Sequence, residues 1–233
     1  MHNQRFQTPT VSQIMLLAAA LLAGSLAWCG TAAAAETPAA KLPQSLVDVG
    51  EFGENIYDAA KAKDWTTAGG KLASLKEAAG RLKKDLAGAD AEQRKNLDQL
   101  DIAIAAVAKA ISAQERQTTM ELANRVTLIA ADLTEPFHPQ PPVAVTRLDY
   151  LGRELEIWAA TGDLKKLQSA ADELVAVWEK VRPGIEAKGG TAEATAFGKL
   201  VGQLKQAKAA GEYGKLATPI LDEVDNLEKV YKK

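Results

Sequence analysis

Cysteine and histidine are almost absent from this sequence. One cysteine, Cys29, and two histidines, His2 and His138, occur among its 233 residues. An intrachain disulfide needs two cysteines, and covalent haem attachment needs a Cys-x-x-Cys-His segment. Zinc and copper sites that are rich in histidine need several imidazole ligands. The sequence therefore excludes all three features within a single chain.

Motifs that support catalysis are missing as well. The serines that follow residue 35 are Ser45, Ser74, Ser112 and Ser169. None of them has the flanking glycines of a nucleophile elbow, and only His138 is available as an imidazole base. The pair Gly189-Gly190 is typical of an interhelical turn rather than of a phosphate-binding loop. We therefore predict that the protein is not an enzyme.

Neither sign of charge dominates the chain. It carries 28 Lys and Arg residues against 30 Asp and Glu residues, and the two signs are interspersed. A nucleic-acid-binding surface needs a concentrated basic patch, so we expect no nucleic-acid partner.

No segment alternates apolar and polar residues with β-branched enrichment, which argues against β-strands.

The first 35 residues have the pattern of a secretory signal peptide. Arg5 precedes an uncharged stretch from Ile14 to Trp28, and Ala33-Ala34-Ala35 forms a cleavage site before Glu36. The apolar stretch is shorter than the roughly 20 residues of a membrane-spanning helix. We therefore predict cleavage and a periplasmic protein, with a flexible mature N-terminus over residues 36–44.

Lipid attachment at Cys29 is the alternative. The segment Leu26-Ala27-Trp28-Cys29 partly matches a bacterial lipoprotein box, although Trp28 is bulky where that box has a small residue. Membrane contact is expected only if Cys29 is lipidated.

The remaining chain contains an internal repeat of about 99 residues. Two apolar series advance in steps of 3 and 4, as one face of a helix in an antiparallel bundle requires. The first series is Trp65, Ala68, Leu72, Leu75, Ala79, Leu82 and Leu86, and the second is Leu164, Leu167, Ala171, Leu174, Trp178, Val181 and Ile185. Apolar series in the flanking segments repeat at offsets of 98 to 100. The sequence predicts an all-α fold, a tandem duplication of an antiparallel four-helix unit, with two bundles in contact.

Eight helices follow from this periodicity. They are expected over residues 45–62, 64–87, 91–113 and 116–133 in unit 1 (45–135), and over 143–161, 163–187, 191–209 and 212–231 in unit 2 (143–233). Residues 136–142 form a proline-rich linker, which cannot continue a helix.

Residues typical of helix termini support these boundaries. Asp64 and Asp163 occupy equivalent positions and are predicted N-caps, while Gly162 suits the left-handed residue that closes a helix. Pro183 and Pro219 are expected to mark a kink or a helix start.

Two tryptophans of the second unit correspond to alanines of the first. Trp158 and Trp178 align with Ala59 and Ala79 at the offset of 99. The small residues indicate either close helix packing or a cavity for a ligand.

Polar residues gather around the linker, where the two units must meet. Two interpretations remain open. In one, Glu135, His138 and Asp149 bind a hard cation, or Arg147 and Arg153 clamp a carboxylate or phosphate. In the other, these side chains form ordinary surface pairs beside a solvated linker. The candidate ligand or metal residues are Asp132, Glu135, His138, Arg147, Asp149, Tyr150 and Arg153.

Duplicated four-helix units behind a signal peptide resemble the layout of the periplasmic imelysin-like proteins associated with iron uptake. The Gly-x-His-x-x-Glu motif of that family is absent here, so the resemblance extends to no binding residue. We expect a non-catalytic, exported binding or interaction protein with a protein partner or a small ligand. The alternative is a metal-binding or metal-delivery protein that uses carboxylates near the linker.

Overall fold

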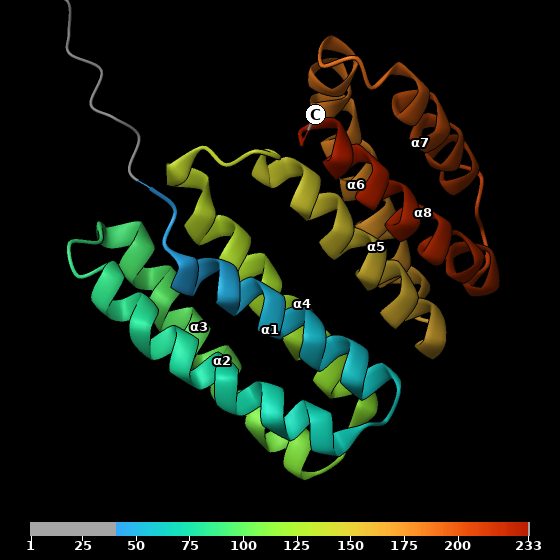
Figure 1. Cartoon of the computed structure of the whole chain (residues 1–233). Coiled ribbons are helices and arrows are strands. Elements are labelled where there is room, and N and C mark those ends of the chain that lie inside the picture. Colours follow the sequence, from blue (N-terminus) through green and yellow to red (C-terminus); the bar gives the residue numbers. More distant parts are fainter. Residues whose placement is uncertain (1–40, 233) are drawn as a thin grey trace, which may run out of the picture. The chain divides into compact units, whose positions relative to one another are not determined.

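The computed structural model describes residues 41–232, which lie within one compact unit of residues 38–233. This range forms eight α-helices, a short 3-10 helix and no strand, so the all-helical prediction is confirmed (Figure 1). None of the helices in this range is long and apolar enough to cross a membrane. The helices are α1 (Gln44–Lys61), α2 (Trp65–Asp85), α3 (Ala91–Ser112), α4 (Arg116–Thr134), η1 (Glu135–Phe137), α5 (Val143–Thr161), α6 (Leu164–Ala187), α7 (Thr191–Leu204) and α8 (Ala210–Val230).

Two predictions concern residues outside this range. The signal peptide over residues 1–35 and the lipid-attachment site at Cys29 both lie outside the described residues.

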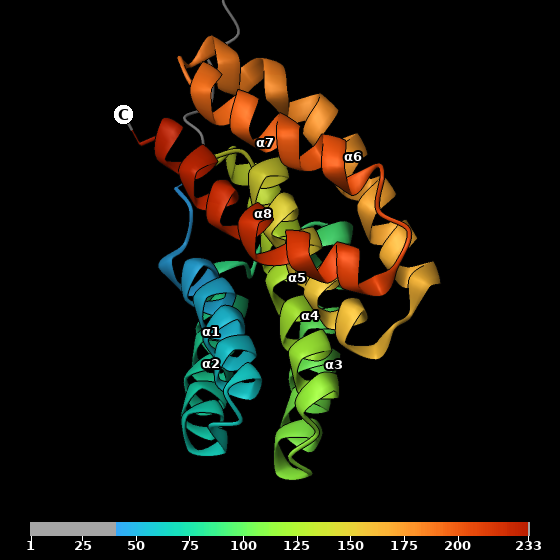
Figure 2. The same ribbon diagram turned by 90° about the vertical axis from the view of Figure 1, so that its right-hand side faces the viewer.

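Contacts between helices fit bundles. α1 packs against α2 and α4, and α3 packs against the same two helices. Likewise, α5 packs against α6 and α8, and α7 packs against that pair. The main link between the two groups is a contact of α4 with α5 (Figures 1 and 2). Residues from α4 and α5 therefore control how the two groups of helices meet.

The predicted N-caps form as expected. The carboxylate of Asp64 accepts a hydrogen bond from the Thr67 N–H at 3.0 Å, and that of Asp163 accepts one from Lys166 at 3.1 Å. These bonds satisfy donors that have no partner within the first turn of a helix. Gly162 closes α5 at φ 73°, in the left-handed region that glycine enters without steric cost.

One helix boundary was wrong. The helix predicted over residues 191–209 ends at Leu204, because the Glu212 carboxylate holds the N–H groups of Lys208 and Ala209 at the start of α8. Of the two roles expected for Pro183 and Pro219, a kink or a helix start, the helix start is excluded. Each lies inside a helix, where proline removes a backbone donor.

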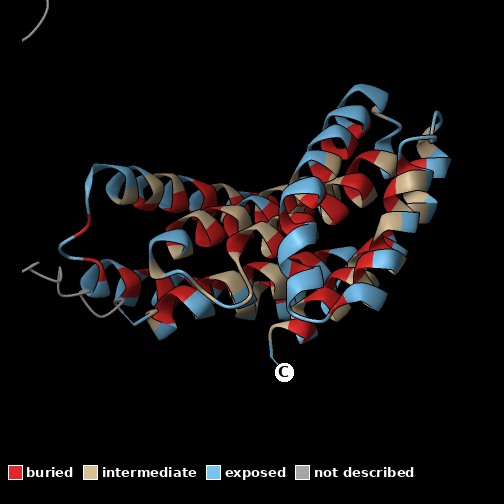
Figure 3. Cartoon of the chain, turned by 90° about the horizontal axis from the view of Figure 1, so that it is seen from above, coloured by how far each residue is buried: buried red, intermediate tan, exposed pale blue. Residues whose placement is uncertain are grey.

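Buried residues line the inward faces of the helices (Figure 3). Trp178 and Phe197 stack with ring centroids 4.6 Å apart, and Ala59 and Ala79 are also buried. Burial of both alanines fits close packing of α1 and α2.

Two glycines mark close approaches of helices. A Cβ atom on Gly53 of α1 would lie 2.9 Å from Thr127 of α4, and one on Gly152 of α5 would lie 2.8 Å from Leu221 of α8. Larger residues would separate both pairs of helices.

Helix α4 has an unusually wide buried face. It contacts α1, α3 and α5, so three polar side chains, Thr119, Asn124 and Thr127, are buried beside its apolar ones. The sequence predicts one apolar stripe on this helix, and the structure buries residues beyond that stripe. The polar side chains of α4 lead directly to the candidate site.

Candidate functional site

The structure separates the seven candidate residues into four places. Asp132, Glu135 and Arg147 lie together beside the linker. Asp149 and Arg153 pair with each other and reach α1. His138 borders a different hollow, which it shares with Glu135, and the Tyr150 carbonyl accepts a hydrogen bond from Asn124.

The residues beside the linker form a polar hollow of about 390 Å³. Arg147 Nη2 lies 2.6 Å from Asp132 Oδ1 and 3.8 Å from Glu135 Oε2. Burial raises the pKa of Asp132, and the Arg147 charge opposes that rise. Asp90, Glu92, Gln93, Asn96 and Pro136 complete the lining.

His138 is exposed and has a left-handed backbone, with φ 48°. Its N–H donates to the Glu135 carbonyl at 3.1 Å, which closes the short helix η1. Within residues 41–232, no group of three or more His, Cys, Asp or Glu side chains is arranged to hold a metal ion.

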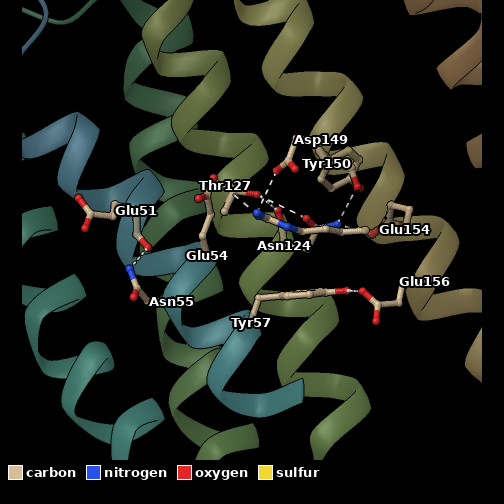
Figure 4. A network of polar contacts seen from close by, with 11 residues as sticks. Glu51, Glu54, Asn55, Tyr57, Asn124, Thr127, Asp149, Tyr150, Glu154 and Glu156 are labelled. Carbon is tan, nitrogen blue, oxygen red and sulfur yellow. Dashed lines mark hydrogen bonds and ion pairs between the residues drawn. The ribbon is translucent and has the colours of Figure 1, made fainter. Parts of the chain in front are cut away.

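The densest polar contacts join α1, α4 and α5 (Figure 4). We call this set the interface network. Tyr57 extends from α1 toward Glu156 of α5, and Asn124 of α4 lies beside Glu154. Its members are Glu54, Tyr57, Asn124, Asp149, Arg153, Glu154 and Glu156.

Arg153 is the cation at the centre of the interface network. Its side chain is 12% exposed and lies 3.0 Å from Asp149, 3.7 Å from Glu54 and 5.3 Å from the centre of the Tyr57 ring. Nη1 is buried and has no hydrogen-bond partner among the described residues. Burial disfavours the charged guanidinium, but the surrounding carboxylates outweigh it and raise the pKa of Arg153.

The carboxylates around Arg153 are partly desolvated. Burial raises the pKa of Asp149 and raises that of Glu54 to about 7, and in both cases Arg153 opposes the shift. The Glu54 side chain remains 42% exposed, so water reaches its carboxylate.

Tyr57 anchors a second contact between α1 and α5. Its hydroxyl donates to Glu156 at 2.9 Å, and Lys61 Nζ lies 2.7 Å from the other oxygen of that carboxylate. Burial, followed by the charge of Glu156, raises the pKa of Tyr57. The phenol is therefore a permanent donor at physiological pH.

Asn124 and Trp158 hold the carboxylate of Glu154. Asn124 Nδ2 donates to Oε1 at 2.9 Å, and Trp158 Nε1 donates to Oε2 at 2.6 Å. The same Asn124 amide donates to the Tyr150 carbonyl at 3.1 Å. Burial raises the pKa of Glu154, against the effect of its two hydrogen-bond donors. Both carboxylate oxygens are thus fixed by the protein.

An open groove of about 430 Å³ lies beside the interface network. Helices α1, α4 and α5, the proline-rich segment and Glu228 of α8 contribute to it. We call it the inter-helix groove. Its apolar wall includes Leu42, Leu46, Val47, Ala130, Ala131 and Val143. The charged side chains that line it are Glu51, Glu54 and Glu228. Outside the lining, Arg153 lies 3.7 Å from Glu54 and Lys232 lies 3.7 Å from Glu228.

Several members of the network were missed by the sequence analysis. Glu54, Tyr57, Asn124, Glu154 and Glu156 lie on helices rather than beside the linker. The repeat carries a usable signal, because Glu54 aligns with Arg153 and Tyr57 with Glu156 at the offset of 99. Both aligned pairs are in contact.

No protein-family model, curated protein sequence or solved structure gives a match to this chain. The function must therefore be argued from the geometry above.

Proposed function

We propose that the protein is an exported, non-catalytic binding protein that engages a partner protein through the inter-helix groove. The observation that carries this proposal is the composition of the groove, in which an apolar wall is bordered by three carboxylates. Such a surface complements a segment with apolar side chains flanked by basic ones. A basic amphipathic helix of a partner has this chemistry.

The interface network supports a binding role rather than a reactive one. Asp149 is paired with Arg153, Glu156 with Tyr57 and Lys61, and Glu154 with Asn124 and Trp158. Catalytic groups need access to a substrate and a proton acceptor that is not already committed. These pairs instead hold α1, α4 and α5 in position around the groove.

A synthetic amphipathic helix of leucine and lysine tests the proposal in vitro. Fluorescence anisotropy should show binding of this peptide and not of the same helix with glutamate in place of lysine. The double variant Glu51→Lys, Glu228→Lys should weaken binding about tenfold, because two attractive contacts become repulsive. Glu77→Lys, on the exposed surface of α2, is the matched control. Equal affinity for the two peptides, or equal effects of the groove and control variants, would contradict the proposal.

Binding of a hard metal cation near the linker is the second candidate. Asp90, Glu92, Asp132 and Glu135 line one hollow, and oxygen ligands suit Mg²⁺ or Ca²⁺. Among residues 41–232 these carboxylates are not grouped to hold an ion as they stand, and a bound ion would also compete with Arg147 for Asp132, which ranks this candidate second. A Ca²⁺-dependent rise in melting temperature that is lost in Asp132→Asn, Glu135→Gln would support it, and its absence would exclude it.

We also propose that the two groups of helices derive from a duplicated antiparallel four-helix unit. Gly53 and Gly152, which are separated by the repeat offset of 99, both stand at close helix approaches. Pairs of aligned residues, such as Tyr57 and Glu156, contact each other across the interface. Pairing of equivalent residues is the property of a two-fold interface between identical subunits. A duplicated gene for a dimeric ancestor accounts for both observations.

A further inference from the structure

A further hollow, separate from the inter-helix groove and from the hollows beside the linker, lies between α4, α5 and α6. Its volume is about 310 Å³, which is at the lower end of the range for small-molecule sites. Two aromatic side chains, Tyr150 and Trp158, form part of its wall. We call it the aromatic hollow. Glu121, Glu154, Lys166 and Glu173 supply its charged groups.

An ammonium group already lies against this wall. Lys166 Nζ is 3.5 Å from the centre of the Trp158 ring, which is a cation–π contact with the face of the indole. Trp158 is itself buried, and its N–H is fixed by the hydrogen bond to Glu154. Lys166 is exposed and lies in the first turn of α6. The aromatic hollow therefore already holds a cation, and this cation belongs to an exposed side chain that can move out into solvent.

Charge in the aromatic hollow is negative even with Lys166 present, since three carboxylates face one ammonium group. The effect is visible on Tyr150. Burial raises the pKa of its phenol, the charges of Glu154, Glu173 and Glu121 raise it further, and the charge of Arg125 opposes them. All three carboxylates therefore act on the aromatic wall, with Arg125 as the opposing charge.

The hydrogen bonding of Glu154 restricts what a ligand can do there. Each of its oxygens already accepts one hydrogen bond, from Asn124 or Trp158, which fixes the position of the negative charge. Attraction to this charge does not require an N–H donor on the ligand. Quaternary as well as primary ammonium groups satisfy it.

We propose that the aromatic hollow binds a small alkylammonium cation, which replaces the Lys166 ammonium group on the face of Trp158. This goes beyond the proposed docking of a partner in the groove, and it holds or fails independently of it. Lys166 acts as an internal competitor that lowers the apparent affinity, because a bound cation must displace it.

Titration calorimetry of the mature protein with putrescine and with choline tests the proposal. Lys166→Ala should tighten binding of at least one of these cations about threefold to tenfold, since it removes the competitor. The double variant Glu121→Gln, Glu173→Gln should weaken binding about tenfold. The matched control is Glu77→Gln on α2, which should leave the affinity unchanged. If putrescine binds and choline does not, the ligand needs N–H donors. If choline also binds, a positive charge is sufficient.

Three results would overturn the proposal. The first is that neither cation, at about 10 mM, gives a heat of binding with Lys166→Ala. The second is that the control variant Glu77→Gln weakens binding as much as the double glutamine variant does. The third is that the double glutamine variant binds with unchanged affinity. The substituted side chains at 121, 166 and 173 are not part of the buried core, and thermal melting would verify that each variant remains folded.

Discussion

Arg153→Met should lower the free energy of unfolding by about 3 kcal/mol at pH 8, near the lower end of the range for breaking a buried ion pair. Methionine keeps most of the length of the side chain while removing its charge. The Asp149 side chain, 18% exposed, then loses its cation, and Glu54, 42% exposed, loses a weaker contact. Exposure of Glu54 is the reason for choosing the lower end of the range.

The loss of stability in this variant should depend on pH. Burial already raises the pKa of Asp149 and Glu54, and Arg153 opposes that rise. Without the guanidinium, both folded-state pKa values should move further above their unfolded values. A carboxyl group with a raised folded-state pKa stabilises the fold at low pH, and this contribution is lost as the pH rises through that pKa. The penalty of Arg153→Met should therefore shrink between about pH 8 and pH 5.

Urea denaturation followed by circular dichroism measures this difference at both pH values. Arg182→Met is the control, because Arg182 forms an exposed pair with Glu186, and its loss should leave stability essentially unchanged. A loss below about 1 kcal/mol at pH 8, the value typical of exposed pairs, would refute the reasoning. So would a loss of equal size at pH 5, because it would not come from ionised carboxylates.

Further predictions concern packing, titration and processing. Gly53→Val should destabilise the fold by about 1–3 kcal/mol, because the larger side chain forces α1 away from α4. Gly70→Ala, where the added methyl group meets open space, should instead stabilise the fold by about 0.5 kcal/mol. Thermal melting compares the two variants, and equal effects would contradict the close approach of α1 and α4 at Gly53. Because the folded-state pKa of Glu54 is raised to about 7, the free energy of unfolding of the wild type should fall more steeply between pH 5 and pH 7 than that of Glu54→Gln. Urea denaturation at each pH measures both, and an equal dependence on pH would contradict this. Mass spectrometry of the exported protein should give an N-terminus at Glu36, and a lipidated Cys29 would contradict it.

Local signals explain why most of the fold could be predicted from the sequence. Asp64 and Asp163 are N-caps because a carboxylate one residue before a helix reaches free N–H groups whatever the tertiary structure. The apolar repeat likewise identifies eight helices, which the structure contains in its described range. Helix α4 was less predictable, since its contacts with α1, α3 and α5 bury more than one stripe.

The candidate site was only partly predictable, because nearness in sequence is a poor guide within a helix. Arg147 and Asp149 are two residues apart on α5, which points them in nearly opposite directions. Arg147 accordingly pairs with Asp132 and Asp149 with Arg153, four residues on. Glu54 joins Arg153 only through packing of α1 near α5, which no local pattern reports.

The role of the inter-helix groove can be tested most directly by photo-crosslinking in cells that produce the protein. A photoreactive amino acid at Val47, a groove residue that is 42% exposed, would be compared with one at Ile102 on α3, which is 71% exposed. The account predicts a discrete protein adduct from position 47 that is absent from position 102 and disappears in Glu51→Lys, Glu228→Lys. Adducts of equal yield from both positions, or an adduct that persists after the charge reversals, would contradict binding of a basic partner in the groove.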